Sequence, residues 1–308
     1  MNLNKEHNFV SAIIYVRNNA DTIKHMLEHV KTNLEKLVEQ YEIICVNDAS
    51  TDESEDVIKA FAKEYDQAIS IVNMGYTQGV ELSMNAGEDL AIGDFVFEFD
   101  RALVSWNEDM MEKIYKKMQE GYDIVSACPT SGIKTSSKIF YSIFNMASNS
   151  PYKLKTESFR LISRRAINRV NSMNHAQMYR KAVNANSALK QTYIEFEPTI
   201  NVKDSKAYSK ERRALAVDSL ILFTDIGYKI AFAISIIMLV FAAIVGIYTV
   251  VVFATGHPVE GWTPIMIFLA IGFFVLFLIL TFVIKYLSLI LNLNFKRQRY
   301  IVEEIIKL

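Results

Sequence analysis

Apolar residues are distributed unevenly along the chain, in short runs over most of its length and in two long runs near the end. The short runs alternate with segments whose apolar side chains recur at helical spacing. The runs at Phe9–Val16, Tyr41–Val46 and Ala68–Val72 predict buried strands, and Asp21–Gln40 predicts a helix that begins near Asp21. Strands that alternate with helices across short loops are typical of a parallel, doubly wound sheet. We therefore expect an α/β domain.

Further elements follow from the same two patterns. They predict strands at Phe95–Phe99, Tyr122–Cys128, Phe159–Ile162 and Tyr193–Pro198, and helices at Glu53–Tyr65, Val80–Leu90, Asn107–Glu120 and Lys138–Met146. The stretch from Pro129 to Asn149 is rich in Ser, Thr and Lys, and we expect it to be a mobile segment over the functional site.

The two long apolar runs predict a membrane hairpin. Ile230–Ala254 is uncharged and Pro264–Ile284 is mostly apolar, and each is long enough to cross a bilayer at ~20 residues per helix. Lys and Arg flank the hairpin but are missing from its connecting loop, so the positive-inside rule places both termini in the cytoplasm. Two buried helices of a soluble protein are the alternative, which this length and apolarity disfavour. The first residues are too polar for a signal peptide.

Composition narrows the class of protein further. A net charge of −1 over 308 residues gives no reason to expect a nucleic-acid partner. Two cysteines without a CxxC motif are typical of buried thiols in a reducing compartment. We expect four parts: a cytoplasmic α/β domain over 1–200, a basic juxtamembrane segment with an amphipathic helix over 201–229, a transmembrane hairpin over 230–292 and a cytoplasmic tail over 293–308.

The stretch from Ala91 to Trp106 carries the candidate chemistry. Phe95, Phe97 and Phe99 share one parity of the predicted strand, while Glu98 and Asp100 share the other. The two carboxylates should therefore lie together at the carboxyl end of a strand, where open α/β sheets bind ligands. A half-buried strand with solvated acids is the alternative.

A series of motifs surrounds this strand in a characteristic order. They are SAIIYVRNNADTI, VNDASTDES, the N-x-G of Asn73 and Gly75, AIGDF, GYDIV, KIFYSIFN, SFRLISRRAI and SKAYS. Their order and spacing resemble the family 2 glycosyltransferases of GT-A fold. The resemblance is to the polyprenyl-phosphate sugar transferases in particular, which include dolichyl-phosphate mannose synthases and bacterial undecaprenyl-phosphate glycosyltransferases.

This resemblance implies a fold and a reaction. The fold is a GT-A-like Rossmann-type, mostly parallel sheet followed by a two-helix transmembrane hairpin, in a bacterial cell membrane. The reaction moves a sugar from a nucleotide sugar to polyprenyl phosphate, for a cell-wall or surface glycan. Asp48 is the implied contact of the base, and we assign Tyr15, Asn47 and Arg101 to the nucleotide as well. Mg²⁺ or Mn²⁺ would bridge the diphosphate to Asp100, the candidate catalytic residue.

The chain departs from the family at this metal site. Where the family reads D-A-D-L-Q, this chain reads Asp100-Arg101-Ala102-Leu103-Val104, and Ala and Val offer no oxygen to a hard cation. Acidic positions of the family also become Asn19, Asn47 and, in a looser alignment, Lys155. Each change at an acidic position removes negative charge, so we expect an eroded metal site.

Two arrangements would preserve a role for this site. Glu98 and Asp100 could hold the metal as a shifted pair, although a merely polar strand residue is the favoured interpretation of Glu98. Alternatively Arg101, with Lys155, could neutralise the diphosphate directly, as Arg does at other phosphates. An Arg101 salt bridge within the protein is the simpler explanation.

Basic residues precede the hairpin. Beside a membrane each contributes ~1 kcal/mol of attraction to anionic lipids. We expect them to dock the domain on the membrane or to bind the lipid phosphate; they are Lys203, Lys206, Lys210, Arg212 and Arg213.

Three functional hypotheses remain open from the sequence. The first is a hexosyltransferase-like enzyme on the cytoplasmic leaflet. The second is a pseudo-glycosyltransferase that binds or scaffolds a membrane glycan-assembly system. The third is a sensor of nucleotide or lipid without turnover. The second hypothesis implies a partner such as an active glycosyltransferase, and the resemblance to membrane-anchored relatives implies a homo-oligomer.

Overall fold

A computed structural model describes residues 6–65, 68–148, 152–172, 179–200, 226–256, 261–294 and 300–308. The chain divides into two compact units. The α/β unit comprises Met1–Ala216 with Lys296–Leu308, and the hairpin unit comprises Val217–Phe295.

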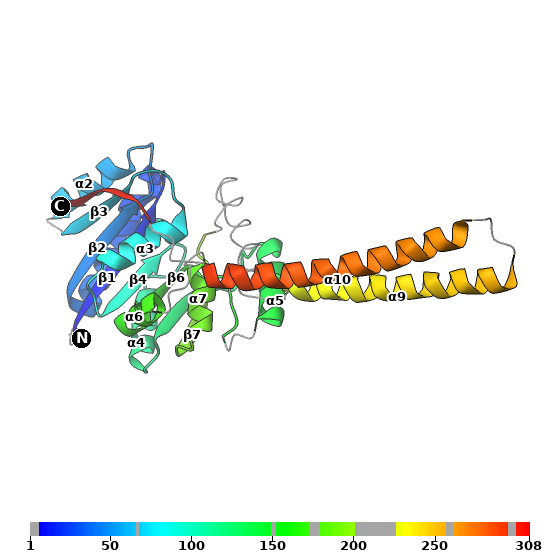
Figure 1. Ribbon diagram of the computed structural model, residues 1–308. Helices are drawn as coiled ribbons and strands as arrows, with labels where there is room; N and C mark the ends of the chain where they lie inside the picture. Colours follow the sequence, from blue (N-terminus) through cyan, green and yellow to red (C-terminus); the bar gives the residue numbers. More distant parts are fainter. Residues whose placement is uncertain are drawn as a thin grey trace. The chain divides into compact units, whose positions relative to one another are not determined.

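The described part of the α/β unit is built on an eight-stranded mixed sheet with the order β7-β5-β6-β4-β1-β2-β3-β8 (Figure 1). The strands are β1 (Glu6–Val16), β2 (Val38–Asn47), β3 (Ile69–Met74), β4 (Phe95–Phe99), β5 (Ile124–Pro129), β6 (Phe159–Ser163), β7 (Gln191–Phe196) and β8 (Val302–Lys307). The pairs β1–β2, β2–β3, β1–β4 and β5–β7 are parallel, whereas β6 runs antiparallel to both β4 and β5. The predicted mostly parallel α/β fold is thereby confirmed.

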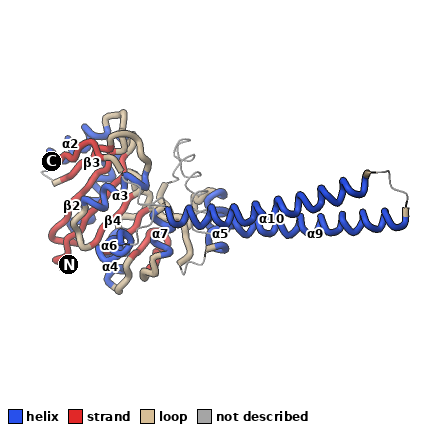
Figure 2. Tube along the Cα trace, viewed as in Figure 1, coloured by secondary structure: helices blue, strands red, loops and turns tan. Residues whose placement is uncertain are grey.

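Helices connect these strands, as the blue and red segments of Figure 2 show. They are α1 (Ala20–Leu37), α2 (Ser54–Tyr65), α3 (Val80–Leu90), α4 (Met110–Gln119), α5 (Thr135–Ala147), α6 (Arg164–Ser172) and α7 (Arg180–Asn186). The apolar sides of α1, α2 and α4 form one buried core, and those of α3 and α6 form a second. The two cores take alternate residues of the same strands, so they cover opposite faces of the sheet.

Successive side chains of β4 point alternately into the two cores, as its sequence predicted. Phe97 and Phe99 stack with ring centroids 6.1 Å apart in the first core, next to Trp106 and Phe159. Val96 lies in the second core. Glu98 has the same parity as Val96, so its side chain lies on the α3 side of the sheet.

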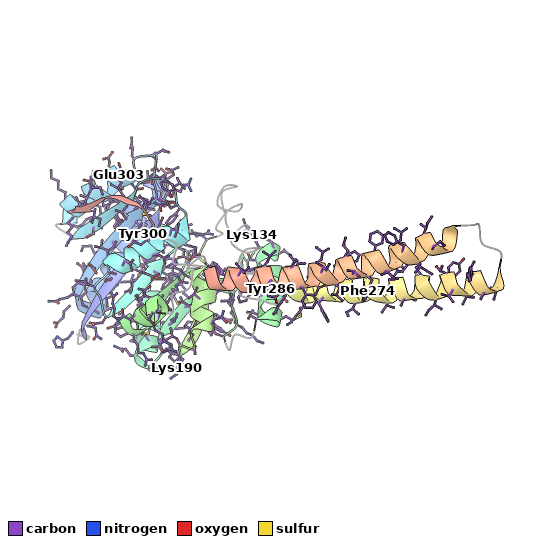
Figure 3. The ribbon with its side chains drawn as sticks, in the orientation of Figure 1. Lys134, Lys190, Phe274, Tyr286, Tyr300 and Glu303 are labelled. Carbon is purple, nitrogen blue, oxygen red and sulfur yellow. The ribbon has the colours of Figure 1, made fainter. Side chains whose placement is uncertain are left out.

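The chain after the hairpin contributes a strand, although the sequence predicted only a tail there. Strand β8 runs antiparallel to β3 and forms the edge of the sheet. Gln78 holds Ile301, the residue just before this strand, through two hydrogen bonds. The Gln78 side-chain NH₂ donates to the carbonyl oxygen of Ile301 at 2.6 Å, and the side-chain oxygen accepts from the Ile301 N–H at 2.9 Å. The hydroxyl of Tyr300, a residue labelled in Figure 3, donates to Asp89 at 2.8 Å.

The hairpin unit contains α9 (Ile226–Thr255) and α10 (Trp262–Asn294). Phe232–Thr255 and Pro264–Leu287 have mean hydropathies of 2.9 and 3.1, and both are long enough to cross a membrane. Their side chains are mostly exposed, unlike those of helices in a soluble core. The Ser235 hydroxyl shares a hydrogen bond with Thr281, which satisfies two polar groups between the helices.

Candidate functional site

The two acids predicted to lie together do so, and they share one partner. Glu98 is the fourth residue of β4, and Asp100 follows the end of that strand. Arg180, the first residue of α7, donates from Nη1 to Glu98 Oε2 at 2.8 Å and from Nη2 to Asp100 Oδ1 at 2.6 Å. The acid pair is therefore bound by a guanidinium from a helix some 80 residues further along the chain.

Arg180 also binds two acids of α3. Its Nε donates to Glu81 Oε2 at 3.1 Å, and its Nη1 lies 3.1 Å from Glu88 Oε1. The backbone N–H of Arg180 donates to the same Glu81 oxygen at 3.0 Å. The Arg180 side chain is only 3% exposed. Four carboxylates thus surround one buried guanidinium, which fixes α7 against α3 and β4.

A second arginine reaches Glu98 from the neighbouring strand. The antiparallel register of β4 and β6 places Arg160 opposite Glu98, and the Arg160 Nε lies 2.6 Å from Glu98 Oε2. Arg160 also lies 3.5 Å from Glu157, which is 3.8 Å from Lys181 Nζ. We call this set the buried charge network; its members are Glu81, Glu88, Glu98, Asp100, Glu157, Arg160, Arg180 and Lys181.

The environment of the network separates the pKa values of its acids. Burial raises the pKa of Glu88 well above its ordinary value, and the charge of nearby Glu98 raises it further, so the surroundings favour the protonated form of Glu88. Burial would also raise the pKa values of Glu98 and Asp100. The charges of Arg160 and Arg180 outweigh that effect and lower both of them, so these two carboxylates stay ionised.

The residues of this site do not fit a divalent metal ion. One oxygen of each acid, Glu98 Oε2 and Asp100 Oδ1, is bonded to Arg180, while the buried Glu98 Oε1 has no hydrogen-bond partner among the described residues. Ala102 is fully buried and Val104 is partly buried, and neither carries a ligand atom. Across the residues that the structure describes, no group of three or more His, Cys, Asp or Glu side chains could hold a metal ion.

The sequence-predicted nucleotide residues Tyr15 and Asp48 lie together, away from the acid pair in the chain. Asp48 is fully buried after β2, and its Oδ2 accepts from the Tyr15 hydroxyl at 2.8 Å and the Gly79 N–H at 3.0 Å. Its Oδ1 accepts from the Gln78 N–H at 2.7 Å. The carboxylate therefore fixes the loop between β3 and α3, whose Gln78 holds the chain before β8.

Other predicted residues occupy separate positions. Asn47 is buried and donates to Asn73 at 2.9 Å. Arg101 is partly buried beside Asp100, yet the cation bonded to Asp100 is Arg180. Lys155 lies 2.9 Å from Glu195 and 3.6 Å from the ring centroid of Tyr193. The basic residues Lys203, Lys206, Lys210, Arg212 and Arg213 lie outside the described residues.

Sequence reasoning missed the acids Glu81, Glu88 and Glu157 of the network, and it missed the cations Arg180 and Lys181. The two cations occur in a stretch with no clear apolar repeat, between the strand predicted at Phe159–Ile162 and the strand predicted from Tyr193. The one available signal was the acid pair itself, because buried carboxylates require cationic partners. That signal predicts a cation without indicating which residue supplies it.

Comparisons with known proteins add a family and a fold. The model of the family described as Glycosyl transferase family 2 matches residues 11–187. An uncharacterized glycosyltransferase of Synechocystis is 27% identical over 271 residues, covering 84% of this chain and 83% of that protein. The undecaprenyl-phosphate 4-deoxy-4-formamido-L-arabinose transferase of Serratia proteamaculans is 31% identical over 116 residues, which cover 38% of this chain and 35% of the transferase.

Among solved structures, a mannosyltransferase from Pyrobaculum calidifontis in complex with GDP-Man and Mn²⁺ has a similar fold. Its TM-score is 0.52 at 16% identity, and the match covers 94% of this chain and 88% of that one. At this identity the similarity establishes the shared fold.

Proposed function

We propose that this chain, which belongs to glycosyl transferase family 2, transfers a sugar from a nucleotide sugar to a polyprenyl phosphate at the cytoplasmic face of a membrane. The family match over residues 11–187 carries the proposal. The partial similarity to undecaprenyl-phosphate transferases and two helices long enough to span a bilayer support the lipid acceptor.

In the proposed reaction, a phosphate oxygen of the lipid attacks the anomeric carbon of the sugar. The bond from that carbon to the diphosphate breaks, and its electron pair leaves with the nucleoside diphosphate. The donor is proposed to lie over the carboxyl ends of β1, β2 and β4, where open α/β sheets bind ligands. Tyr15, Asn47, Asp48 and Arg101 are positioned in or just after these strands.

Asp48 is assigned to the nucleotide through the loop that it shapes. Its two oxygens already accept hydrogen bonds from Tyr15, Gln78 and Gly79. A buried carboxylate with this many donors holds its surroundings rigid. We therefore infer that Asp48 and Tyr15 serve donor binding chiefly by fixing the loop at Gln78 and Gly79.

The acceptor side of the proposal rests on the membrane hairpin. The basic residues of the juxtamembrane segment, from Lys203 to Arg213, are proposed to attract the lipid phosphate and anionic headgroups. With Lys and Arg flanking the hairpin and missing from its loop, we place both termini in the cytoplasm.

A second candidate function is supported by one observation, the binding of Arg180 to the acid pair. A metal-dependent transferase uses such acids to hold the cation that stabilises the leaving diphosphate. With Glu98 and Asp100 bonded to Arg180, the fold would serve as a non-catalytic partner of a membrane glycan-assembly system.

A transfer assay separates the two candidates. Membranes containing the full chain are incubated with undecaprenyl phosphate and labelled UDP- and GDP-sugars, with Mn²⁺ or with a chelator. The proposed enzyme gives a lipid-linked labelled sugar that membranes lacking the chain do not form. If no donor gives this product under either condition, the non-catalytic candidate is supported and the transferase proposal fails.

A further inference from the structure

The acid pair at the end of β4 has a cation that belongs to the protein itself. Three different nitrogens of Arg180 are used, since Nε binds Glu81, Nη1 binds Glu88 and Glu98, and Nη2 binds Asp100. The distances run from 2.6 to 3.1 Å, so each contact is within hydrogen-bonding distance. The planar fork of the guanidinium thus fits four carboxylates that come from two elements and a loop.

Because these side chains are buried, water cannot readily replace the contacts between the Arg180 guanidinium and its acids. The side chains of Arg180 and Glu98 are 3% and 0% exposed, and that of Asp100 is 22% exposed. Ions this deeply buried persist when they are paired and hydrogen-bonded. Arg180 is therefore an integral part of the folded site, in the same way that a bound ion would be.

The charge balance of the network favours the guanidinium as its cation. Its cations are Arg160, Arg180 and Lys181, which lie among the five acids of the network. Arg180 is the cation that contacts four of those acids, so its removal would leave them without their shared partner. A divalent ion would have to enter beside a guanidinium that already occupies this position, and the two positive charges would repel each other.

We propose that the guanidinium of Arg180 takes the place of a divalent cation at the acid pair, so that this protein does not bind Mg²⁺ or Mn²⁺ at Asp100. Ala102 and Val104 agree with this, because a site that holds a guanidinium has no need of further oxygen ligands. A consequence that rests on the proposed function is that any sugar transfer by this chain is insensitive to chelators.

The test measures metal binding and requires no turnover. Mn²⁺ is titrated into the full chain in detergent and followed by electron paramagnetic resonance, for wild type, Asp100→Asn, Arg180→Gln and Arg180→Gln with Asp100→Asn. Arg165→Gln is the matched control, because Arg165 is 74% exposed and pairs with Asp123 outside the network.

We expect no difference between wild type, Asp100→Asn and Arg165→Gln. Arg180→Gln should gain Mn²⁺ affinity by tenfold or more, and Asp100→Asn in the same chain should abolish the gain. Mn²⁺ binding to wild type that Asp100→Asn removes would overturn the inference. So would a folded Arg180→Gln protein that gains no Mn²⁺ binding.

Two features keep the result decisive. If Arg180→Gln does not fold, wild type against Asp100→Asn still tests the inference, and Arg180→Lys tests whether a cation of different shape also excludes Mn²⁺. The result is also separate from the transferase proposal. A metal-free wild type without sugar transfer removes the proposed function alone, whereas Asp100-dependent Mn²⁺ binding removes this inference alone.

Discussion

Nη2 of Arg180 lies 2.6 Å from Oδ1 of Asp100, at the position in the chain where the family resemblance implies a metal ligand. The contact joins the end of β4 to the start of α7 and is shielded from solvent on the arginine side. It places a fixed monovalent cation beside an aspartate whose neighbours at 102 and 104 have no ligand oxygens. The stability and the pH response of the α/β unit should therefore depend on this network.

Loss of the guanidinium should destabilise the α/β unit strongly. Arg180→Met removes the shared partner of four acids, and breaking a buried ion pair from one side costs about 3–5 kcal/mol. Thermal unfolding of the full chain in detergent should show a clear decrease in Tm. Lys113→Met, which breaks an ion pair whose two side chains are 53% and 52% exposed, should change the Tm little. Equal Tm values for the Arg180 and Lys113 variants would contradict a structural role of the network.

Glu88 should make the folded protein less stable as the pH rises. Burial and the charge of Glu98 raise its pKa in the folded chain. At pH values between the ordinary pKa and the raised pKa, Glu88 therefore binds fewer protons in the unfolded chain than in the folded chain. The free energy of unfolding should therefore decrease with pH in that window, by at most about 1.4 kcal/mol per pH unit for one proton. Glu88→Gln cannot release this proton and should lose that part of the slope.

The measurement for Glu88 is chemical unfolding of wild type and Glu88→Gln from about pH 5 to about pH 8, above the ordinary carboxylate pKa. Glu98 and Asp100 have lowered pKa values, so their contribution is constant there and is lost only in more acidic solution. Parallel pH profiles for the two proteins would show that Glu88 is already ionised in the folded state.

Asp48 should contribute more stability than its partner Tyr15. Asp48→Asn replaces one acceptor oxygen by an NH₂ group, so a buried N–H of Gln78 or Gly79 loses its acceptor, at about 1–3 kcal/mol. Tyr15→Phe removes a single hydroxyl donor and should cost about 1 kcal/mol. Chemical unfolding gives both values, and amide exchange at Gln78 and Gly79 locates the effect. A larger loss for Tyr15→Phe would be inconsistent with Asp48 as the centre of this loop.

Gln78 should control how firmly β8 is held at the sheet edge. Gln78→Ala removes both hydrogen bonds to the backbone of Ile301, worth about 1 kcal/mol in total at this partly exposed position. Amide exchange across Val302–Lys307 should then be roughly fivefold faster. Tyr76→Ala, at an exposed side chain of the same loop, is the control. Unchanged exchange in Gln78→Ala would mean that pairing with β3 alone holds the strand.

The strand–helix pattern was sufficient to predict the α/β fold, and the family match confirms the resemblance drawn from motif order. Alternation in Phe95–Asp100 also predicted which side chains share a face, because that property depends on local strand geometry alone. The partner of Glu98 and Asp100 could not be predicted in the same way. Arg180 reaches them through the tertiary fold from a short helix without a strong apolar repeat.

Strand β8 was missed for a related reason. Val302–Lys307 has a weak alternation and mostly exposed side chains, so its strand conformation depends on the free edge of β3. Backbone pairing of this kind leaves little trace in side-chain composition. Both omissions concern contacts made between distant parts of the chain.

The most direct test of the central claim is anomalous diffraction at the manganese edge, from crystals of the full chain grown with Mn²⁺ and a nucleotide sugar. We predict no manganese peak within bonding distance of Asp100, with the Arg180 guanidinium still between Glu98 and Asp100. A manganese ion bound to Asp100, with Arg180 displaced from the acid pair, would contradict the account.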